Sequence, residues 1–475
     1  MPVREALGVF ALAVVWALVV RPGGLSLPYF WDEADVYAPG AKWLADHDLD
    51  PTPGHFPDDW SRGHPQLLYV LAAFAFRLFG AAPAVGHALI VPFTALALAA
   101  TYVLGAERAG RAVGAGAAVL LATSPLFLSM GAFLLPEMPL TALTALALVL
   151  AARGQIVAAA GVGVALVALK ETGVGPPIAI AGGIVFEALR HKRLRTALRP
   201  VAISLVPVLA LGAFFVWQRA TAGYFVFPHH TDLLVARPFS AENAVTIFPS
   251  LLVWHGRWVV TACALVAVAV LAVRRAWPAT LRADASNVAV LLLLLGNAVF
   301  FAKMFWLERY ALPVHPGVCV LLVVATVEAA RLLPRRARVL VAAVPIFAAA
   351  AIGTFSLRVA GESAEHTFAF ADIVESHREA YARIASSPGV DPVVVTTWPE
   401  TTELREPWLG YVDRPVRSVH PDRLVDHPGW LPDVVLVDPS SHERDGLRML
   451  AREHGLRLRS TVVRGQAPRL EIWSR

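Results

Sequence analysis

The chain has 475 residues, of which 57% are hydrophobic and 16% are charged, and its formal net charge is +5. Soluble domains contain about 45–50% apolar and about 25% charged residues, so this composition excludes an ordinary soluble protein. The apolar residues form blocks of roughly 16–20, a length that suits the hydrocarbon core of a bilayer. The sequence therefore predicts a polytopic α-helical membrane protein, with the lipid bilayer as its first partner.

The first apolar block covers residues 5–21, and a basic residue, Arg4, directly precedes it. No small-x-small cleavage site follows the block, because Arg21-Pro22-Gly23-Gly24 comes next. We therefore interpret it as a retained membrane span and not as a cleaved signal peptide. With it, about 11 spans are predicted. They cover residues 5–21, 86–104, 112–131, 138–152, 155–169, 173–189, 200–217, 257–273, 286–303, 310–330 and 339–357.

An acidic cluster follows the first span, in the segment PYFWDEADVYAPG, Pro28–Gly40. Asp32, Glu33 and Asp35 stand there among aromatic residues. Acids in an external loop can be solvated and inert, but a carboxylate held near an aromatic surface could act as a general base. In an extended segment Asp35 would point to the same side as Glu33, because side chains alternate along a strand.

The stretch Gln66–Gly80, QLLYVLAAFAFRLFG, decides on which side of the membrane every later loop lies. Short loops rich in Lys and Arg stay in the cytoplasm. The four later basic loops all fall inside only if this stretch lies flat on the outer surface as an amphipathic helix, which Arg77 also favours. The basic loops contain Arg108 with Arg111; Arg190, Lys192, Arg193, Arg195 and Arg199; Arg274, Arg275 and Arg282; and Arg331, Arg335, Arg336 and Arg338.

This topology predicts that the conspicuous polar residues share the external face. They are the acidic cluster at Asp32, Glu137 in LLPEMPL, the Lys170-Glu171 pair, the His229-His230 loop, and LERY at 307–310. External histidines, His64 among them, show no spacing that specifies a metal site, so no metal ligand is predicted. Cys263 and Cys319 fall inside apolar blocks and predict neither a disulfide nor a metal site.

The chain after residue 359 differs in kind, because no further span is predicted there. DPVVVTTW (391–398) and PDVVLVD (432–438) are short runs rich in β-branched residues, as in strands. Residues 365–385 and 440–455 have helical spacing. Alternation of helix and strand predicts a small α/β domain, 359–475, and the count of spans places it outside.

The order of several motifs resembles the GT-C membrane glycosyltransferases, most closely the family 39-like group of protein O-mannosyltransferases and bacterial lipid A aminoarabinose transferases. The resemblance covers about residues 1–330 and is specific for the superfamily more than for a substrate. The motifs are the Asp-Glu of the first external loop, YAPGAKWLADHDL, GHPQLLYVLAAFAFRLFG, SPLFLSMGAFLLPEMPLTAL and ERYALPVHPGV.

The resemblance implies a transmembrane catalytic domain, 1–358, with a first external loop at about 22–85. It implies an inverting transfer of a sugar from a polyprenyl-phosphate donor to a glycan, lipid or protein acceptor, at the outer face of a plasma membrane. Asp32 and Glu33 match the first acidic motif, with Asp32 as the base. Glu137 takes the second acidic position, where relatives often have Asp. Superfamily members with and without a divalent metal are known, and the motif does not decide between them.

Cations at the external span ends are candidates for binding the donor phosphate. Arg309 and Arg257 each begin a span; an arginine there can anchor to lipid headgroups or hold a phosphate with its planar fork. Lys170 can snorkel beside an acid or bind the phosphate. Glu137 can likewise stand at the start of a helix only because its negative charge interacts favourably with the helix dipole. Glu171, Tyr310 and His64 complete the set of site candidates.

Two other function classes remain to be weighed. A transporter or flippase would place ionisable residues at mid-membrane on broken helices and often contains a repeat, and neither pattern is found. A non-catalytic scaffold would not require the acidic pair. The sequence contains no Gly-rich phosphate loop or nucleotide-binding signature, which agrees with a lipid-linked donor, and no nucleic-acid partner is predicted.

Overall fold

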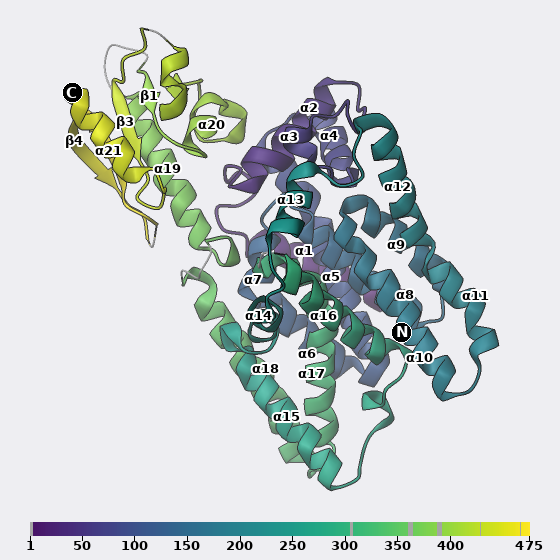
Figure 1. Ribbon diagram of the computed structural model, residues 1–475. Coiled ribbons are helices and arrows are strands. Elements are labelled where there is room, and N and C mark those ends of the chain that lie inside the picture. The colour runs from purple at the N-terminus through teal and green to yellow at the C-terminus, as the bar shows by residue number, and fades with distance from the viewer. Residues whose placement is uncertain (1–2, 305–306, 360–363, 387–391, 428, 466) are drawn as a thin grey trace.

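The computed structural model describes residues 3–304, 307–359, 364–386, 392–427, 429–465 and 467–475. Helices dominate the first three quarters of the chain (Figure 1). They are α1 (Val3–Val19), α2 (Ala38–Asp46), α3 (Asp58–Ser61), α4 (Leu67–Phe79), α5 (Pro83–Ala109), α6 (Arg111–Ala122), α7 (Pro125–Met130), α8 (Glu137–Ala152), α9 (Ile156–Leu169), α10 (Gly175–Arg190), α11 (Leu194–Ser204), α12 (Val206–Ala222), α13 (Pro228–Ala236), α14 (Ala241–Leu252), α15 (Arg257–Val273), α16 (Ala285–Lys303), α17 (His315–Ala330) and α18 (Arg335–Phe355).

Seven helical stretches of the described residues are long and apolar enough to cross a membrane. They are Pro83–Ala109, Glu171–Arg190, Leu194–Ala222, Trp254–Val273, Ala279–Lys303, Glu308–Ala330 and Arg335–Arg358. The helices α6, α8 and α9 are apolar but shorter. All the predicted spans coincide with helices, but two of them are divided between two α-helices. The span 112–131 is divided between α6 and α7, because Pro125 cannot continue α6, and 200–217 is divided between α11 and α12 at Leu205. The total of about 11 spans stays a prediction.

Proline sets the start of many of these helices. Proline stands in the first turn, where its missing N–H is not needed, of seven of them: α2, α5, α7, α10, α12, α13 and α17. Between α9 and α10 the chain is instead interrupted by one extended residue, Lys170, with φ −164° and ψ 146°. This interruption brings a lysine and the following Glu171 to the junction of two apolar helices.

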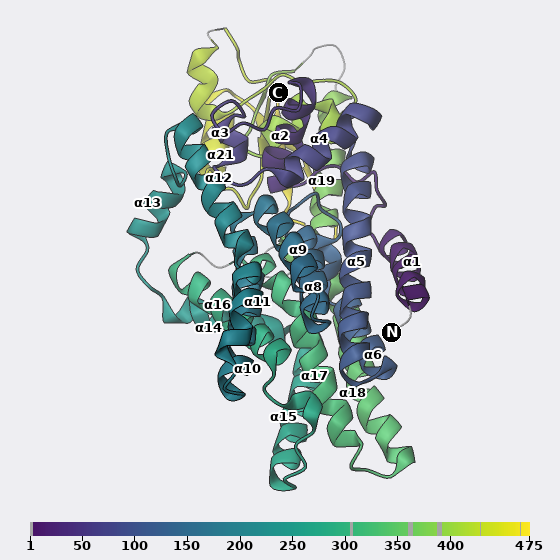
Figure 2. The ribbon, with the colours of Figure 1, turned by 90° about the vertical axis from the view of Figure 1, so that its right-hand side faces the viewer.

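The four basic loops meet at one end of the molecule. Arg108 lies 2.5 Å from Asp284 and Arg190 donates to the Ala283 carbonyl, so two of these loops contact the loop before α16. Arg331, after α17, donates to the Ala109 carbonyl at 3.1 Å. In Figure 2 the loops lie at the lower end, opposite the first loop and the C-terminal part. The prediction that they share one side is confirmed; which side is cytoplasmic stays a prediction.

The first loop is helical where an extended segment was expected. Residues Glu33–Tyr37 form a π-helix, η1, which continues into α2. Phe30, Ala34 and Ala38 are buried, and this spacing of four residues forms one face of a helix. The expectation that Asp35 and Glu33 share a side is therefore wrong.

The stretch Gln66–Gly80 contains α4, whose 13 residues span about 20 Å, less than the roughly 30 Å of a hydrocarbon core. It packs on α2 at the upper end in Figure 1. A helix was correctly predicted here, and its orientation in the membrane stays a prediction.

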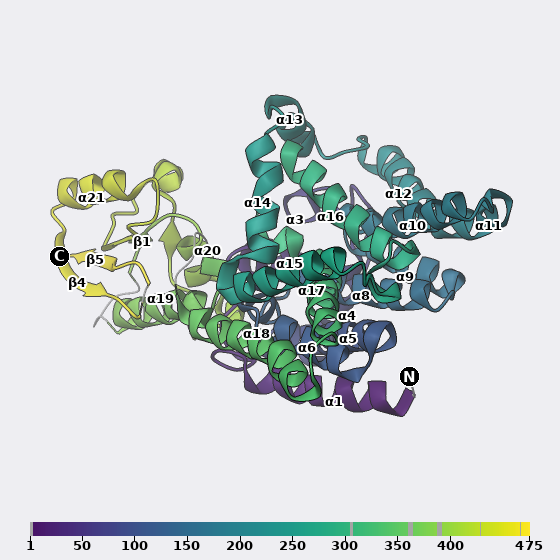
Figure 3. The ribbon, with the colours of Figure 1, turned by 90° about the horizontal axis from the view of Figure 1, so that it is seen from below.

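The C-terminal part contains a five-stranded sheet in the order β2-β1-β3-β5-β4. The strands β2, β1 and β3 are parallel, whereas β5 runs antiparallel to β3 and β4. The strands are β1 (Val394–Val395), β2 (Ser418–Val419), β3 (Val434–Val437), β4 (Arg457–Val462) and β5 (Leu470–Ser474), and the helices are α19 (Ala369–Ala385), α20 (Glu400–Arg405) and α21 (Arg444–Glu453). Seen from below, the sheet lies to one side of the helices (Figure 3).

Two strands and two helices of this part were predicted, and the mixed sheet between them agrees with a small α/β arrangement. The predicted strand 391–398 is much shorter in the structure, and Asp391 lies outside the described residues. The C-terminal part packs on the first loop through segments beside its sheet, where Tyr29 N donates to the Leu409 carbonyl at 3.0 Å. The rings of Trp31 and Trp398 meet at 5.1 Å.

Candidate functional site

Arg309 lies at the centre of a group of ionised side chains drawn from the whole length of the chain. It stands in the 3-10 helix η5 (Glu308–Val314), which leads into α17, and is only 5% exposed. Its Nη1 donates to Glu365 Oε2 at 2.6 Å, and its Nη2 donates to Asp32. Its Nε lies 3.8 Å from Glu137 Oε1. The structure therefore brings Asp32, Glu137 and Arg309 together.

Lys170 extends this group toward a cavity. Its Nζ lies 3.4 Å from Glu137 Oε1 and 4.5 Å from the centre of the Tyr310 ring. Glu137 opens α8, where the charge suits the helix dipole, and is 2% exposed. The negative charge of the buried Glu137 carboxylate is balanced by the two cations beside it. Any anion that approached Lys170 would compete with Glu137 for the lysine.

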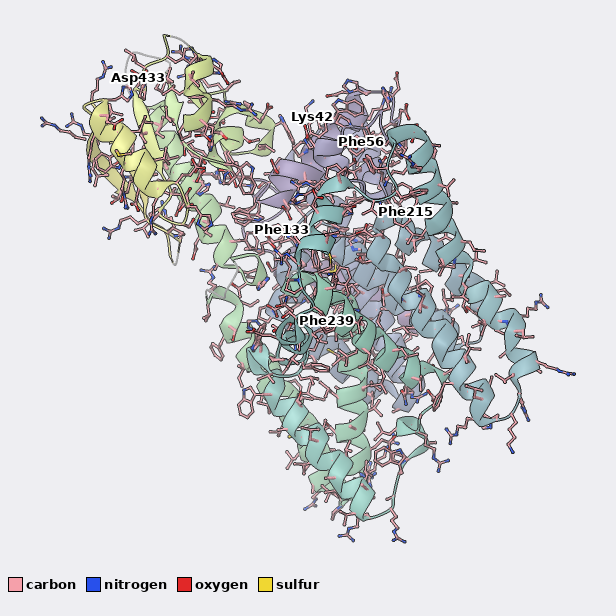
Figure 4. The ribbon with its side chains drawn as sticks, viewed as in Figure 1. Lys42, Phe56, Phe133, Phe215, Phe239 and Asp433 are labelled. Atoms are coloured by element: carbon pink, nitrogen blue, oxygen red, sulfur yellow. The ribbon has the colours of Figure 1, made fainter. Side chains whose placement is uncertain are left out.

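The cavity has a volume of about 730 Å³ and lies between α8, α10, α12 and α16. Its wall is mostly apolar, with Phe215 of α12, labelled in Figure 4, on one side. Glu137, Lys170, Glu171 and Tyr310 line it as well. These four stand at helix starts or breaks, so the polar groups gather at one end of an apolar space.

His64 reaches the same end of the cavity from the first loop. Its Nδ1 lies 2.9 Å from Glu171 Oε2, and its ring meets that of His230 at 4.9 Å. Burial lowers the pKa of His230 to about 4, so this neighbour is uncharged at neutral pH. The sequence candidates His64, Glu171 and Lys170 therefore come together.

Glu33 has a different environment from its neighbour Asp32. It is fully buried, and its two oxygens accept from the backbone N–H groups of Phe30 at 3.1 Å and Leu134 at 2.6 Å. His87 Nε2 lies 2.9 Å from it. These contacts fix the first loop to the segment before α8, so Glu33 positions the loop, and it lies away from the cavity lining.

Arg257 joins a second buried group and not the one around Arg309. It donates to the Ser250 carbonyl and to Ser124 Oγ, while Glu308 accepts from Ser250 Oγ at 3.0 Å. His366 Nδ1 lies 2.9 Å from Glu308. In this conformation the guanidinium of Arg257 is already bound to Ser250 and Ser124, so it is not placed to contact a phosphate held at Lys170.

Asp35 lies on the outer side of the first loop, 3.3 Å from Arg62. Burial raises the pKa of its carboxyl, an effect that the Arg62 guanidinium opposes. Burial also raises the pKa of Glu365, and there Arg309 is the opposing charge. Arg309 is thus the main charge that favours the ionised form of Glu365.

Glu365 and His87 were not among the predicted site residues. Glu365 follows the last span, and the local sequence gives no sign of its contact with Arg309, 56 positions earlier. Phe133, labelled in Figure 4, likewise contacts residues that are distant in the sequence. It stacks on Phe30 of the first loop, and its ring centre lies 4.4 Å from that of Phe370 in α19.

The carboxylates of this site do not fit a divalent metal in the described conformation. Arg309 and Lys170 contact one oxygen of each of Asp32, Glu137 and Glu365, so each carboxylate already has a cation of the chain beside it. Among the described residues, the group of three close metal-ligating side chains lies elsewhere, in the C-terminal part. No step of the reaction is therefore assigned to a metal here.

No family model and no curated protein matches the sequence. Solved structures do match. ArnT from Cupriavidus metallidurans bound to undecaprenyl phosphate aligns with a TM-score of 0.58 over 99% of this chain and 98% of that chain, at 15% identity. The same protein in the apo state gives 0.57.

An Archaeoglobus fulgidus oligosaccharyltransferase, in complex with Zn and sulfate, aligns with a TM-score of 0.51 over 93% of this chain and 69% of that chain, at 15% identity. Both neighbours are GT-C proteins. At such identity a likeness shows the fold alone. The chain has the GT-C fold, as the resemblance of its motifs led us to expect.

Proposed function

We propose that this protein is an inverting glycosyltransferase that moves a sugar from a polyprenyl-phosphate donor to an acceptor at the external face of the membrane. The observation that carries the proposal is the apolar cavity that ends at Lys170 and Glu137 and is connected through Arg309 to Asp32. Such a space suits a molecule with a long hydrocarbon tail and an anionic head.

The donor's tail would lie along the apolar wall, and its phosphate would bind Lys170 at the polar end. Lys170 is held by Glu137 at 3.4 Å, which is long for a charge-assisted contact, so an entering phosphate can take its place. The neighbour ArnT was solved with undecaprenyl phosphate, which supports a carrier of this class here.

The chemistry then needs one base and one cationic group. Asp32 would accept the proton of an acceptor hydroxyl as its oxygen attacks the anomeric carbon. The bond from that carbon to the phosphate oxygen breaks, and the polyprenyl phosphate leaves with both electrons. Lys170 and Arg309 would stabilise the negative charge on this leaving group. Attack opposite the leaving group inverts the anomeric configuration.

The remaining parts of the proposal follow from the topology. The catalytic domain is 1–358 with its first external loop at 22–85, and 359–475 forms an external domain of a multi-pass plasma-membrane protein. The acceptor is a glycan, a lipid or a protein. Transport is not favoured, because the charged groups around Arg309 gather at helix ends, whereas a transporter would place such groups at mid-membrane.

The test is a transfer assay with purified protein and a panel of sugars carried on polyprenyl phosphate or on nucleotides. We expect transfer from a lipid-linked sugar, with inversion at the anomeric carbon, and none from nucleotide sugars. Efficient direct use of a nucleotide sugar without a lipid intermediate would contradict the proposal.

Asp32→Asn and Asp46→Asn provide the matched pair for that assay. Asp46 lies in the same loop but is exposed and paired with Lys42 at its surface. Removing a general base typically lowers the rate by about 10²–10⁴-fold, so Asp32→Asn should lose that much while still binding donor. The control should keep normal turnover. Near-normal turnover of Asp32→Asn would move the role of base to Glu137.

A further inference from the structure

A second group of buried polar side chains lies in the C-terminal part, at the carboxyl ends of its parallel strands. Asp438 directly follows β3, and Glu400 opens α20 five residues after β1 ends. His377 comes from α19. Asp433, labelled in Figure 4, marks the opposite end of β3. The carboxyl edge of parallel strands is where open α/β sheets bind ligands.

Two members of this group, Glu400 and His377, have buried polar atoms without partners. Glu400 is 0% exposed, and neither of its carboxylate oxygens accepts a hydrogen bond. His377 is 2% exposed, and its Nε2 also lacks a partner. A buried carboxylate left unpaired costs several kcal/mol, so native proteins pair such groups or use them to coordinate metals. The cluster therefore calls for a cation.

The orientation of His377 is fixed by a further carboxylate. Its Nδ1 lies 2.7 Å from Glu403 Oε2, which also accepts from the Tyr381 hydroxyl at 2.5 Å. This bond places the proton on Nδ1 and leaves the Nε2 lone pair for a ligand. The same carboxylate–histidine arrangement orients metal-binding histidines in general.

The remaining ligand atoms converge on one point. One atom from each of His377, Glu400 and Asp438 lies within 4.8 Å of the others. Bonds of about 2.0–2.2 Å to zinc would bring such atoms to within roughly 3.5 Å, a shift of about an ångström. One imidazole nitrogen with two carboxylates is a donor set that zinc accepts.

We propose that His377, Glu400 and Asp438 bind one Zn²⁺ ion in the C-terminal domain, with Glu403 as the positioning residue of His377. Zinc binds such nitrogen and oxygen donors more tightly than Mn²⁺ or Fe²⁺. This site is separate from the group around Arg309, and it does not depend on the proposed transfer reaction.

The ion would also fix the contact between the C-terminal part and the first loop. Trp398 lies two residues before Glu400 and meets Trp31, the residue before Asp32. A ligand at Glu400 would hold the start of α20 and, with it, this contact. The zinc would thus have a structural role, because it would stabilise the packing of the C-terminal part on the acidic first loop.

The first test is the metal content of the full-length protein, purified from zinc-supplemented cells and dialysed. We expect about one zinc per chain by mass spectrometry of the elements. The zinc content of Glu400→Gln should be at least tenfold lower than that of the wild type. Glu375→Gln, at an exposed position of α19, should keep the wild-type zinc content. Less than a tenth of an equivalent in the wild type, or full zinc in Glu400→Gln, would overturn the proposal.

A second variant keeps the test valid if Glu400→Gln does not fold. His377→Cys preserves a ligand at the site, and a thiolate bound to Co²⁺ gives a sulfur-to-metal absorption band that an imidazole does not give. We expect this band in His377→Cys and not in the wild type, whose two cysteines lie in α15 and α17. Its absence in Co²⁺-loaded His377→Cys would overturn the assignment of His377 as a ligand.

Discussion

Arg309 balances three carboxylates, and two of these, Glu137 and Glu365, are 2% and 6% exposed. Removing one partner of a buried ion pair costs about 3–5 kcal/mol, because the other charge is left uncompensated. Arg309→Ala should therefore lower the midpoint of thermal unfolding and the yield of protein in detergent. Adding Glu365→Gln should recover part of the stability, because it removes one of the unpaired acids, but it should not restore turnover.

The control for this prediction is Arg62→Ala, which breaks the partly exposed pair with Asp35. Exposed pairs contribute about 0–1 kcal/mol, so its thermal midpoint should stay close to that of the wild type. An Arg309→Ala protein as stable as Arg62→Ala would mean that the acids around Arg309 are already protonated or hydrated.

Single residues show where sequence reasoning ends. Glu137, Lys170 and Arg309 could be selected because each stands at a span boundary in an apolar chain. Asp32 could be selected because it stands in an acidic cluster among aromatic residues and matches the first acidic motif of the family that the chain resembles. Asp32 and Glu33 could not be told apart, because adjacent residues on a helix point in different directions once the helix is known. Arg257 and Glu365 depend on contacts between distant segments, which no local pattern records.

At the scale of the element, α16 lines the cavity with Gly296, and a Cβ built there meets no atom within 4 Å. Gly296→Leu should therefore fold and extend a side chain into the space proposed for the donor's tail. Displacing one isoprenoid unit loses hydrophobic burial of about 1.5–3 kcal/mol. The KM for the lipid-linked donor should rise roughly 10–100-fold in the transfer assay, with a smaller change in kcat.

Gly161→Leu on α9 is the matched control, because a Cβ there also meets open space and Gly161 is not among the cavity-lining residues. Its KM should stay at the wild-type value. Equal KM values for the two variants would show that the tail does not occupy the cavity beside α16.

Elements were predictable in proportion to their length and apolar content. The apolar blocks gave the long helices, since burial in lipid requires this composition. The break between α6 and α7 was not predicted, because residues 112–131 are continuously hydrophobic and Pro125 was not treated as the end of a helix. The strands β2, β4 and β5 were missed, because β2 has only two residues and β4 begins with exposed Arg457 and Arg459 and lacks an apolar face at its start.

The whole molecule has two chemically different ends. At one end, Arg108 and Arg190 donate to carbonyls of the loop before α16, and Arg331 donates to the Ala109 carbonyl at the end of α5. The other carries the first loop, the group around Arg309 and the C-terminal sheet. This division could be predicted from loop charge alone, since the positive-inside rule acts on whole loops and does not require knowledge of side-chain contacts.

If the basic end is cytoplasmic, the C-terminal sheet is external. Single cysteines can test this after Cys263 and Cys319 are replaced by alanine. Met449→Cys on α21 and Leu194→Cys at the start of α11 both stand at exposed positions, 59% and 49%. A membrane-impermeant maleimide should label Met449→Cys in intact cells and Leu194→Cys only after the membrane is opened. The reverse pattern would mean that α4 crosses the bilayer and that the basic loops lie outside, against the rule from which the topology was inferred.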